Sequence, residues 1–264
     1  MSTRALRAGC SSQDAVLTVN AVTKTYAKHA ALRGASVAVP AGQVHGLLGP
    51  NGSGKSTMLH VLTGLIPPDA GSVFIQDLRI EDKASRASLG FAPDDLPLPA
   101  VLTGLEYLDL HDALRSRRDH ERARVLAHVL GIDGALGRQI AEYSHGMKRK
   151  IQLVAALMHQ PKLLVLDEPF RGLDPDTASV LRELLVCFVG SERAVLVATH
   201  DMLRAERDCD VVTILDRGQV VVSGAPKELI SDVPGAQSLE DVFLELTGRC
   251  HEVDRRSLLI EKLF

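Results

Sequence analysis

The chain has 264 residues, 45% of them hydrophobic and 24% charged, and its 30 basic and 33 acidic side chains give a net charge of −3. These values are typical of a globular protein with one large or two small domains, and they exclude a disordered chain. The slight acidic excess disfavours a non-specific nucleic-acid binder. With no Trp, three Tyr and six Phe, the sequence also disfavours a stacking platform for single-stranded nucleic acid.

No apolar run reaches the ~20 residues that a membrane-spanning helix needs. The first basic residues are not followed by the apolar core of a secretory signal, so none is expected. The four cysteines, Cys10, Cys187, Cys209 and Cys250, form no C-x-x-C pair. This spacing argues against a zinc site or a redox motif and favours reduced thiols in a cytoplasmic protein.

The first half of the chain predicts short strands around one helix. Residues 1–15 are small and polar and are expected to form a flexible tail. A helix is expected at 55–65, because its composition is helical and it stops before Pro67 and Pro68. Apolar runs, some alternating with polar residues, predict strands at 16–22, 37–42 (ending in a turn), 44–48, 71–78 and 89–92.

The second half begins with a helical block and then returns to strands. Apolar spacing predicts amphipathic helices within 105–114, 125–130 and 147–158, which together indicate a helical subdomain at about 95–160. After it, strands are expected at 163–166, 194–198, 211–215 and 219–223, with helices at 177–189 and shortly after 198. Strands that alternate with helices predict a mainly parallel sheet covered on both faces.

Residues 49–57 read Gly-Pro-Asn-Gly-Ser-Gly-Lys-Ser-Thr and match G-x-x-x-x-G-K-[ST] between a predicted strand and a predicted helix. Glycines allow successive backbone N–H groups to point at phosphate oxygens, and the helix N-terminus adds its dipole. Lys55 would reach the β- and γ-phosphates, and the Ser56 hydroxyl would bind Mg²⁺. The alternative, a glycine-rich turn with a chance lysine, is disfavoured by the elements on both sides.

The apolar strand predicted at 163–166 is followed by Asp167 and Glu168. An Asp at the carboxyl end of a buried strand can hold Mg²⁺ beside the phosphates. Glu168, next to it, can polarise the attacking water as a general base. Taken alone, such a pair would more often begin a helix-capping turn, but the phosphate loop favours the catalytic interpretation.

With these motifs the chain resembles the nucleotide-binding subunits of ATP-binding-cassette (ABC) transporters over residues 16–248. Tyr-Ser-His-Gly-Met at 143–147 stands where the family has its Leu-Ser-Gly-Gly-Gln signature, and Gly-Leu-Asp-Pro at 172–175 matches the loop that follows the paired carboxylates. His200, after a predicted strand, matches a histidine that binds the γ-phosphate and positions the attacking water. Tyr26 stands where the family has an aromatic side chain that stacks on adenine.

The resemblance implies a P-loop NTPase core with a mainly parallel sheet, an N-terminal antiparallel β subdomain and an inserted helical subdomain. It leaves residues 249–264 as a C-terminal tail, either a short docking helix or a frayed end. It implies three catalytic residues, Lys55, Glu168 and His200, and three Mg²⁺ ligands, Ser56, Asp94 and Asp167. The residues implied to bind ATP, on this chain or its partner, are Tyr26, Gly49, Pro50, Asn51, Gly52, Ser53, Gly54, Lys55, Ser56, Thr57, Asp94, Ser144, Gly146 and Asp174.

Two positions depart from the common family pattern. Asp94 follows the strand predicted at 89–92, where the family often has Gln. Phe170 and Arg171 replace small polar residues before Gly172. The acidic residue near position 94, the signature variant and Ser-Leu-Glu-Asp-Val-Phe at 238–243 resemble the ABC-2 exporter-type branch. Asp is one methylene shorter than the Glu of that branch, which shortens its reach to Mg²⁺ or water.

The function implied by the resemblance is an ATP-hydrolysing subunit, with Mg²⁺ as cofactor, that powers an exporter. Two identical or related subunits would sandwich ATP, with Ser144 and Gly146 of one chain facing the γ-phosphate held by the other. A separate membrane-embedded permease would hold the subunit at the cytoplasmic face, and no nucleic-acid partner is expected. The alternative is a soluble ABC ATPase acting on nucleic acid or ribosomes, which usually carries two cassettes or a long coiled coil. A non-hydrolysing binding module is disfavoured by the intact catalytic residues.

Overall fold

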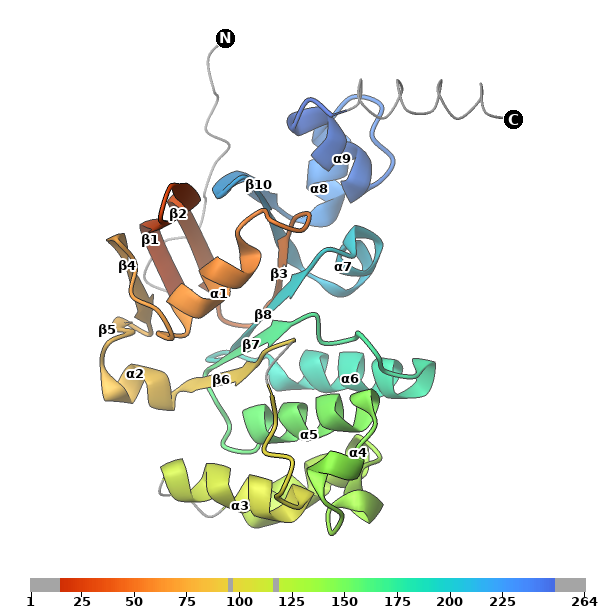
Figure 1. Cartoon of the computed structure of the whole chain (residues 1–264). Helices are drawn as coiled ribbons and strands as arrows, with labels where there is room; N and C mark the ends of the chain where they lie inside the picture. The colour runs from red at the N-terminus through yellow and green to blue at the C-terminus, as the bar shows by residue number, and fades with distance from the viewer. Residues whose placement is uncertain (1–14, 95–96, 116–118, 250–264) are drawn as a thin grey trace.

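The fold is built from two β-sheets with helix α1 (Lys55–Leu62) packed between them and further helices on the far face of the larger sheet (Figure 1). The structure is a computed structural model and describes residues 15–94, 97–115 and 119–249. Most of the two expected tails, residues 1–14 and 250–264, lies outside the described residues. The expected boundaries between these tails and the central domain therefore stay predictions.

The smaller sheet is antiparallel and has the order β2-β1-β4-β5. It confirms the N-terminal antiparallel subdomain. Its strands are β1 (Ala15–Tyr26), β2 (His29–Pro40), β4 (Ala70–Ile75) and β5 (Leu78–Arg79). β1 and β2 are longer than predicted because register shifts interrupt the apolar alternation, with Ala21 at a φ of 44°. The single strand predicted at 71–78 is two strands, joined by a turn at Gln76 and Asp77 with positive φ.

The larger sheet has the order β10-β9-β3-β8-β7-β6 and is parallel except for β10, as expected. Its strands are β3 (Val44–Leu48), β6 (Leu89–Ala92), β7 (Leu163–Asp167), β8 (Ala194–Thr199), β9 (Val211–Asp216) and β10 (Gln219–Gly224). The carboxyl ends of parallel strands meet at one edge of a sheet. The loops after β3, β6, β7 and β8 therefore converge there, and these loops carry the predicted active-site residues.

Both faces of the larger sheet are buried, which explains its uninterrupted apolar strands. In β7, Leu163 and Val165 belong to the core around α1. Leu164 and Leu166 belong to the core under α5 (His145–Leu157) and α6 (Pro175–Phe188) on the opposite face. All four side chains are fully buried. Successive residues of one strand thus pack on different helices, so the strand fixes both layers relative to the loop that follows it.

The inserted helical subdomain is also confirmed. It consists of α3 (Gly104–Arg115), α4 (His120–Val129) and α5, with short 3-10 turns at Asp133–Ala135 and Ile140–Glu142. Beyond it, α7 (Met202–Asp208), α8 (Pro226–Asp232) and α9 (Leu239–Leu246) pack on β9 and β10 around a third core. Helix α2 (Lys83–Ala87) precedes β6. Within the described part of the chain, none of these helices is long and apolar enough to cross a membrane.

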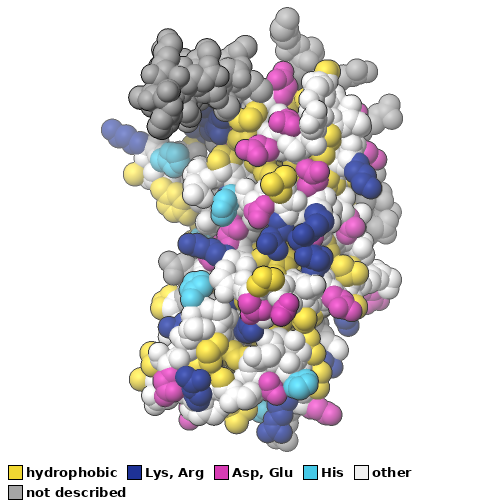
Figure 2. Space-filling view, turned by 90° about the vertical axis from the view of Figure 1, so that its right-hand side faces the viewer, with side chains coloured by type: hydrophobic (Ala, Val, Ile, Leu, Met, Phe, Trp, Pro, Cys, Tyr) yellow, Lys and Arg dark blue, Asp and Glu magenta, His cyan; other side chains and the backbone are white. Residues whose placement is uncertain are grey.

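Charged side chains are mixed on the surface shown in Figure 2. Acidic and basic side chains both occur on this face, with a group of basic side chains near its middle and hydrophobic side chains among them. A mixed face of this kind creates no strong field of one sign, in keeping with the net charge of −3.

Gly90 in β6 lies where the larger sheet meets the helical subdomain, and a side chain is not accommodated there. A Cβ at this position would lie 2.2 Å from the Ala156 carbonyl oxygen and 2.8 Å from Pro161 Cγ. Gly90→Ala is therefore expected to lower the free energy of unfolding by about 1–3 kcal/mol, measured by urea denaturation. The control is Gly137→Ala, whose Cβ would meet nothing within 4 Å and should change stability by less than about 0.5 kcal/mol. Equal losses in both variants would contradict this account.

Candidate active site

The loop between β3 and α1 depends on glycine at its two ends. Gly49 and Gly54 have φ of 152° and 109°. A Cβ on Gly49 would lie 2.2 Å from the Leu215 carbonyl oxygen, and one on Gly54 would lie 2.6 Å from that of Ala31. Gly52, in the middle, has a φ of 79° and meets nothing within 4 Å. The ends of the loop are packed tightly against neighbouring backbone, whereas its middle faces open space that a ligand can occupy.

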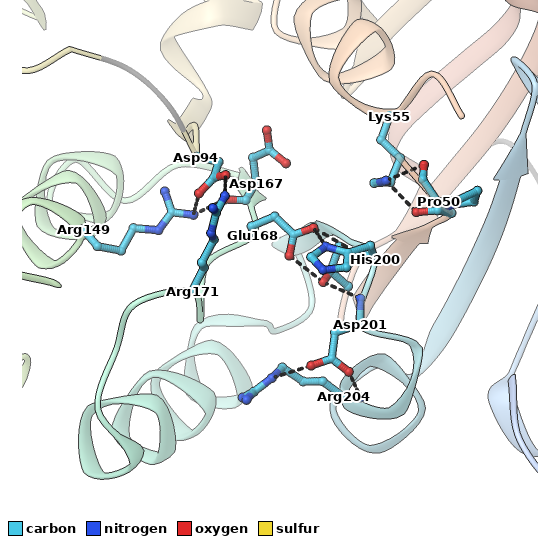
Figure 3. A network of polar contacts seen from close by, with 12 residues as sticks. Pro50, Lys55, Asp94, Arg149, Asp167, Glu168, Arg171, His200, Asp201 and Arg204 are labelled. Carbon is cyan, nitrogen blue, oxygen red and sulfur yellow. Dashed lines mark hydrogen bonds and ion pairs between the residues drawn. The ribbon is translucent and has the colours of Figure 1, made fainter. Parts of the chain in front are cut away.

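Lys55 begins α1, and its side chain folds back over this loop. Its Nζ donates to the carbonyl oxygens of Gly49 at 2.6 Å and Pro50 at 3.2 Å (Figure 3). Burial lowers the pKa of Lys55, while the charges of Glu168 and Asp167 raise it. The first turn of α1 contains no acidic residue, and Gly54 offers no capping side chain. A buried ammonium group and an uncompensated helix N-terminus together make an anion site.

Glu168, directly after β7, has both carboxylate oxygens engaged. Oε2 accepts from Thr199 Oγ1 at 2.8 Å, and Oε1 accepts from the His200 backbone N–H at 2.9 Å. Oε1 also lies 2.6 Å from His200 Nδ1 (Figure 3). Glu168 has a φ of 46°, a region that non-glycine residues rarely adopt and that is found more often at functional sites. The ends of β7 and β8 thus bring the predicted base and the predicted histidine together.

Asp167 and Asp94 place two more carboxylates at this edge. Burial, and then the charges of Asp94 and Glu168, raise the pKa of Asp167. Arg171 Nη1 donates to Asp94 Oδ2 at 2.7 Å, and Arg149 Nη2 lies 3.9 Å from Asp94 Oδ1. Each oxygen of Asp94 therefore faces a guanidinium group (Figure 3).

Arg149 connects the loops after β6 and β7. Its Nη1 donates to the Pro93 carbonyl oxygen at 2.5 Å, and its Nη2 donates to that of Asp167. The residue is 3% exposed, and burial lowers its pKa. The sequence did not identify Arg149, Arg171 or Thr199 as parts of the site. A usable signal existed for Arg149, since it is a charged residue among the buried positions of α5.

The donor atoms present fit a magnesium nucleotide. The hydroxyl group of Ser56 and the carboxylates of Asp94 and Asp167 are hard oxygen donors, which Mg²⁺ prefers. Among the residues that the structure describes, no three His, Cys, Asp or Glu side chains form a metal site by themselves.

Ser144 and Gly146 begin α5, which covers the face of the larger sheet opposite α1 (Figure 1). Ser144 Oγ caps the helix by accepting from the Met147 N–H at 3.2 Å. A Cβ on Gly146 would lie 2.9 Å from the Gly172 carbonyl oxygen, so the loop after β7 requires glycine here. The structure does not bring these two residues to the phosphate loop of their own chain.

Asp174 and Tyr26 lie at the periphery of the site. Asp174 caps α6 by accepting from the Thr177 N–H and Oγ1, both at 2.8 Å, and these bonds lower the pKa of Asp174 to about 2. Tyr26 ends β1 in the smaller sheet and is 45% exposed, with Lys24 Nζ 6.0 Å from its ring centroid. Asp174 thus has a structural role within the chain, and Tyr26 offers a half-exposed ring.

Comparison with known proteins identifies the family. The family model described as "ABC transporter" matches residues 32–171. The chain belongs to the ABC transporter family. It is 32% identical over 261 residues to daunorubicin resistance ATP-binding protein DrrA3 of Streptomyces coeruleorubidus, covering 93% of this chain and 83% of that protein. It is 34% identical over 224 residues to Nod factor export ATP-binding protein I of Burkholderia lata, covering 83% and 74%.

A solved structure described as the ATP binding subunit of an ABC transporter has the same fold, with a TM-score of 0.83 at 29% identity over 88% of this chain and 99% of that one. The protein is therefore an ATP-binding and ATP-hydrolysing subunit of an ABC transporter, which confirms the family resemblance and the P-loop NTPase fold. Nothing in these comparisons favours the alternative of a soluble ABC ATPase acting on nucleic acid.

The crowding of carboxylates in the ABC subunit predicts a stability change in Asp167→Asn without nucleotide or divalent cations. Because the folded protein raises the pKa of Asp167, the ionised form is disfavoured there relative to the unfolded chain. The amide should therefore raise the free energy of unfolding by about 0.5–1 kcal/mol at pH 7, a small gain because the group is partly exposed. The gain should shrink as the pH falls through the folded-state pKa and be lost by about pH 3, where the carboxyl is largely protonated in both states. Urea denaturation at both pH values, in EDTA, measures it, and a loss of stability at pH 7 would contradict it.

Proposed function

We propose that this ABC subunit drives export and that its ATPase site is completed by a second copy or a related subunit. The relatives named for daunorubicin resistance and for Nod factor export support the outward direction. The two-chain site is supported by one observation in particular. The phosphate loop and the Ser144-capped start of α5 both have the features of anion sites, but they lie on opposite faces of the sheet.

In the proposed site the phosphates are held by the loop from Gly49 to Ser53 and by its neighbours Gly54, Lys55 and Thr57. Mg²⁺ would be held by Ser56, Asp167 and Asp94, and when bound it neutralises phosphate charge. Tyr26 would stack on adenine. The second subunit would supply Ser144 and Gly146 to the γ-phosphate, and its Asp174 would contact the first subunit across the interface.

The hydrogen bonds at the ends of β7 and β8 support a proposal for the hydrolysis step. Glu168 would accept a proton from the attacking water through a carboxylate oxygen, after exchanging one of its bonds to Thr199 or His200. The side chain of His200 is 58% exposed, and its Nε2 would donate to a γ-phosphate oxygen while Nδ1 stays near Glu168. Lys55 would stabilise the charge on the transferred phosphoryl group.

Glu168→Gln tests the catalytic assignment. The amide keeps the size of the side chain but cannot take the proton, so ATP hydrolysis should fall by about 100-fold or more while ATP binding persists. The variant should accumulate as a dimer on gel filtration with ATP and Mg²⁺. Full turnover would remove Glu168 from the role of base.

Adding Ser144→Arg to Glu168→Gln extends the experiment to the two-chain site. The long cationic side chain would stand where the second subunit closes, so the ATP-dependent dimer should be lost. Binding of a fluorescent ATP analogue to the monomer should not change. Ser144→Ala in the same background loses the helix cap and the proposed phosphate contact but adds neither bulk nor charge, so it should weaken the dimer much less than the Arg variant and is the matched control. A dimer that persists in the Arg variant would show that Ser144 does not face the nucleotide.

We further propose that a membrane-embedded permease docks in the cleft between α2 and α3 and so holds the subunit at the cytoplasmic face of the membrane. The cleft has a volume of about 420 Å³, and its wall includes Lys83, Arg86, His111, Leu114 and Arg115. Leu114 is 76% exposed. Basic and apolar side chains together suit an acidic, amphipathic segment. Arg115 also donates to the Leu89 carbonyl oxygen at the start of β6, the strand that leads to Asp94. Movement of the docked segment would therefore reach the site through β6.

Charge reversal tests this docking surface. Tagged wild-type protein, recovered from detergent-solubilised native membranes, should bring down a protein with several membrane spans, identified by mass spectrometry. Lys83→Glu with Arg86→Glu should lose that partner while still binding ATP. Lys227→Glu, on the exposed surface of α8, is the matched control and should retain it. Recovery of only soluble or ribosomal proteins by the wild type would overturn the transport assignment.

A further inference from the structure

The carboxylate of Asp94 is held between two arginines that play different parts. Arg149 is buried and is fixed by main-chain carbonyl oxygens of the loops after β6 and β7. Its distance of 3.9 Å from Asp94 Oδ1 is a loose contact. Arg171 makes the closer contact, at 2.7 Å from Oδ2, although its side chain is 66% exposed. Arg171 can therefore leave Asp94 with little reorganisation of the core, whereas Arg149 cannot.

The main chain of Arg171 is tied to the proposed base. Its N–H donates to the Glu168 carbonyl oxygen at 3.1 Å, and the Leu173 N–H donates to that of Phe170 at 3.3 Å. The Phe170 ring packs on the core below and lies 4.7 Å from the guanidinium carbon of Arg204. Phe170 anchors this turn, so the side chain of Arg171 projects toward Asp94 (Figure 3). These contacts explain the two residues that depart from the small polar pair common in the family.

The charge around Asp94 shows why its partner matters. Asp94, Asp167 and Glu168 lie at the ends of the neighbouring parallel strands β6 and β7, which brings three carboxylates to one edge of the sheet. Only Asp94 comes from the loop after β6, and its carboxylate is the one that Arg171 neutralises. A divalent cation near Asp167 would attract the same carboxylate, so the cation and the guanidinium group compete for Asp94.

We propose that Arg171 is a positioning residue, which holds the Asp94 carboxylate in the nucleotide-free subunit and competes with a bound divalent cation for it. The inference depends on the proposed function in one respect, the placement of the metal near Asp167 and Asp94. Its other support is the ion pair between Asp94 and Arg171, together with the fact that Arg149 is buried whereas Arg171 is exposed.

Direct measurement of metal affinity tests the proposal. Mn²⁺ binding to the purified subunit in the presence of ADP is followed by the electron paramagnetic resonance signal of free Mn²⁺. Arg171→Gln should tighten Mn²⁺ binding by about two- to fivefold, the range for an exposed ion pair. Asp94→Asn should weaken it, and Arg171→Gln should then have no further effect. The matched control is Arg138→Gln, which removes an exposed arginine paired with Glu142 and should leave Mn²⁺ affinity unchanged.

The outcomes separate this proposal from its alternatives. If Arg171→Gln still tightens Mn²⁺ binding in the Asp94→Asn background, the cause is a general charge effect. That result would overturn the positioning role. A purely structural role would lower stability in urea with no change in Mn²⁺ affinity, and that result would also overturn it. Unchanged Mn²⁺ affinity in Asp167→Asn would instead refute the metal site of the proposed function, and this inference with it.

Discussion

The buried guanidinium group of Arg149 is the interaction on which the geometry of the site depends. Arg149 lies on α5, yet its donors reach carbonyl oxygens at the ends of β6 and β7. A buried charge is costly unless it is paired and hydrogen-bonded, so these acceptors cannot be withdrawn separately. The helical subdomain and two loops of the active site are thereby joined through one side chain. Because Ser144 caps α5, the surface expected to face a second subunit is linked through Arg149 to the main chain just before Glu168.

The edge of the sheet also explains the balance of charge at the active site. Three carboxylates converge because the neighbouring parallel strands β6 and β7 end there, and the fold compensates them with Lys55, Arg149 and Arg171. Glu168 is held by Thr199 and His200 with a backbone conformation that costs energy. The proposed base is thus placed before any partner arrives. The second candidate anion site, the Ser144-capped start of α5, lies on the face of the larger sheet opposite α1.

The sequence predicted those parts of the structure that are specified locally. The phosphate loop was recognisable from its glycines, and β7 from its continuous apolar run, because both depend on short-range geometry. The full lengths of β1 and β2 were missed, since bulges break the alternation. Helices α2 and α8 have five and seven residues, too short for a periodic pattern. Helix α9 was not predicted either, although Ser238 as its cap and its buried apolar residues on one face offered a signal.

The pairing of Asp94 with Arg171 could not be predicted in the same way, because it joins residues 77 positions apart on different strand ends. Each residue by itself was only a departure from the family pattern. Together they form a neutral pair at a position where the family often has a neutral Gln. Exchanging Asp94 for Gln would leave Arg171 without its carboxylate partner, and exchanging Arg171 would leave Asp94, beside Asp167 and Glu168, with only its looser contact to Arg149. Positions 94 and 171 therefore constitute one electrostatic unit, and a substitution at either has to be interpreted with the residue present at the other.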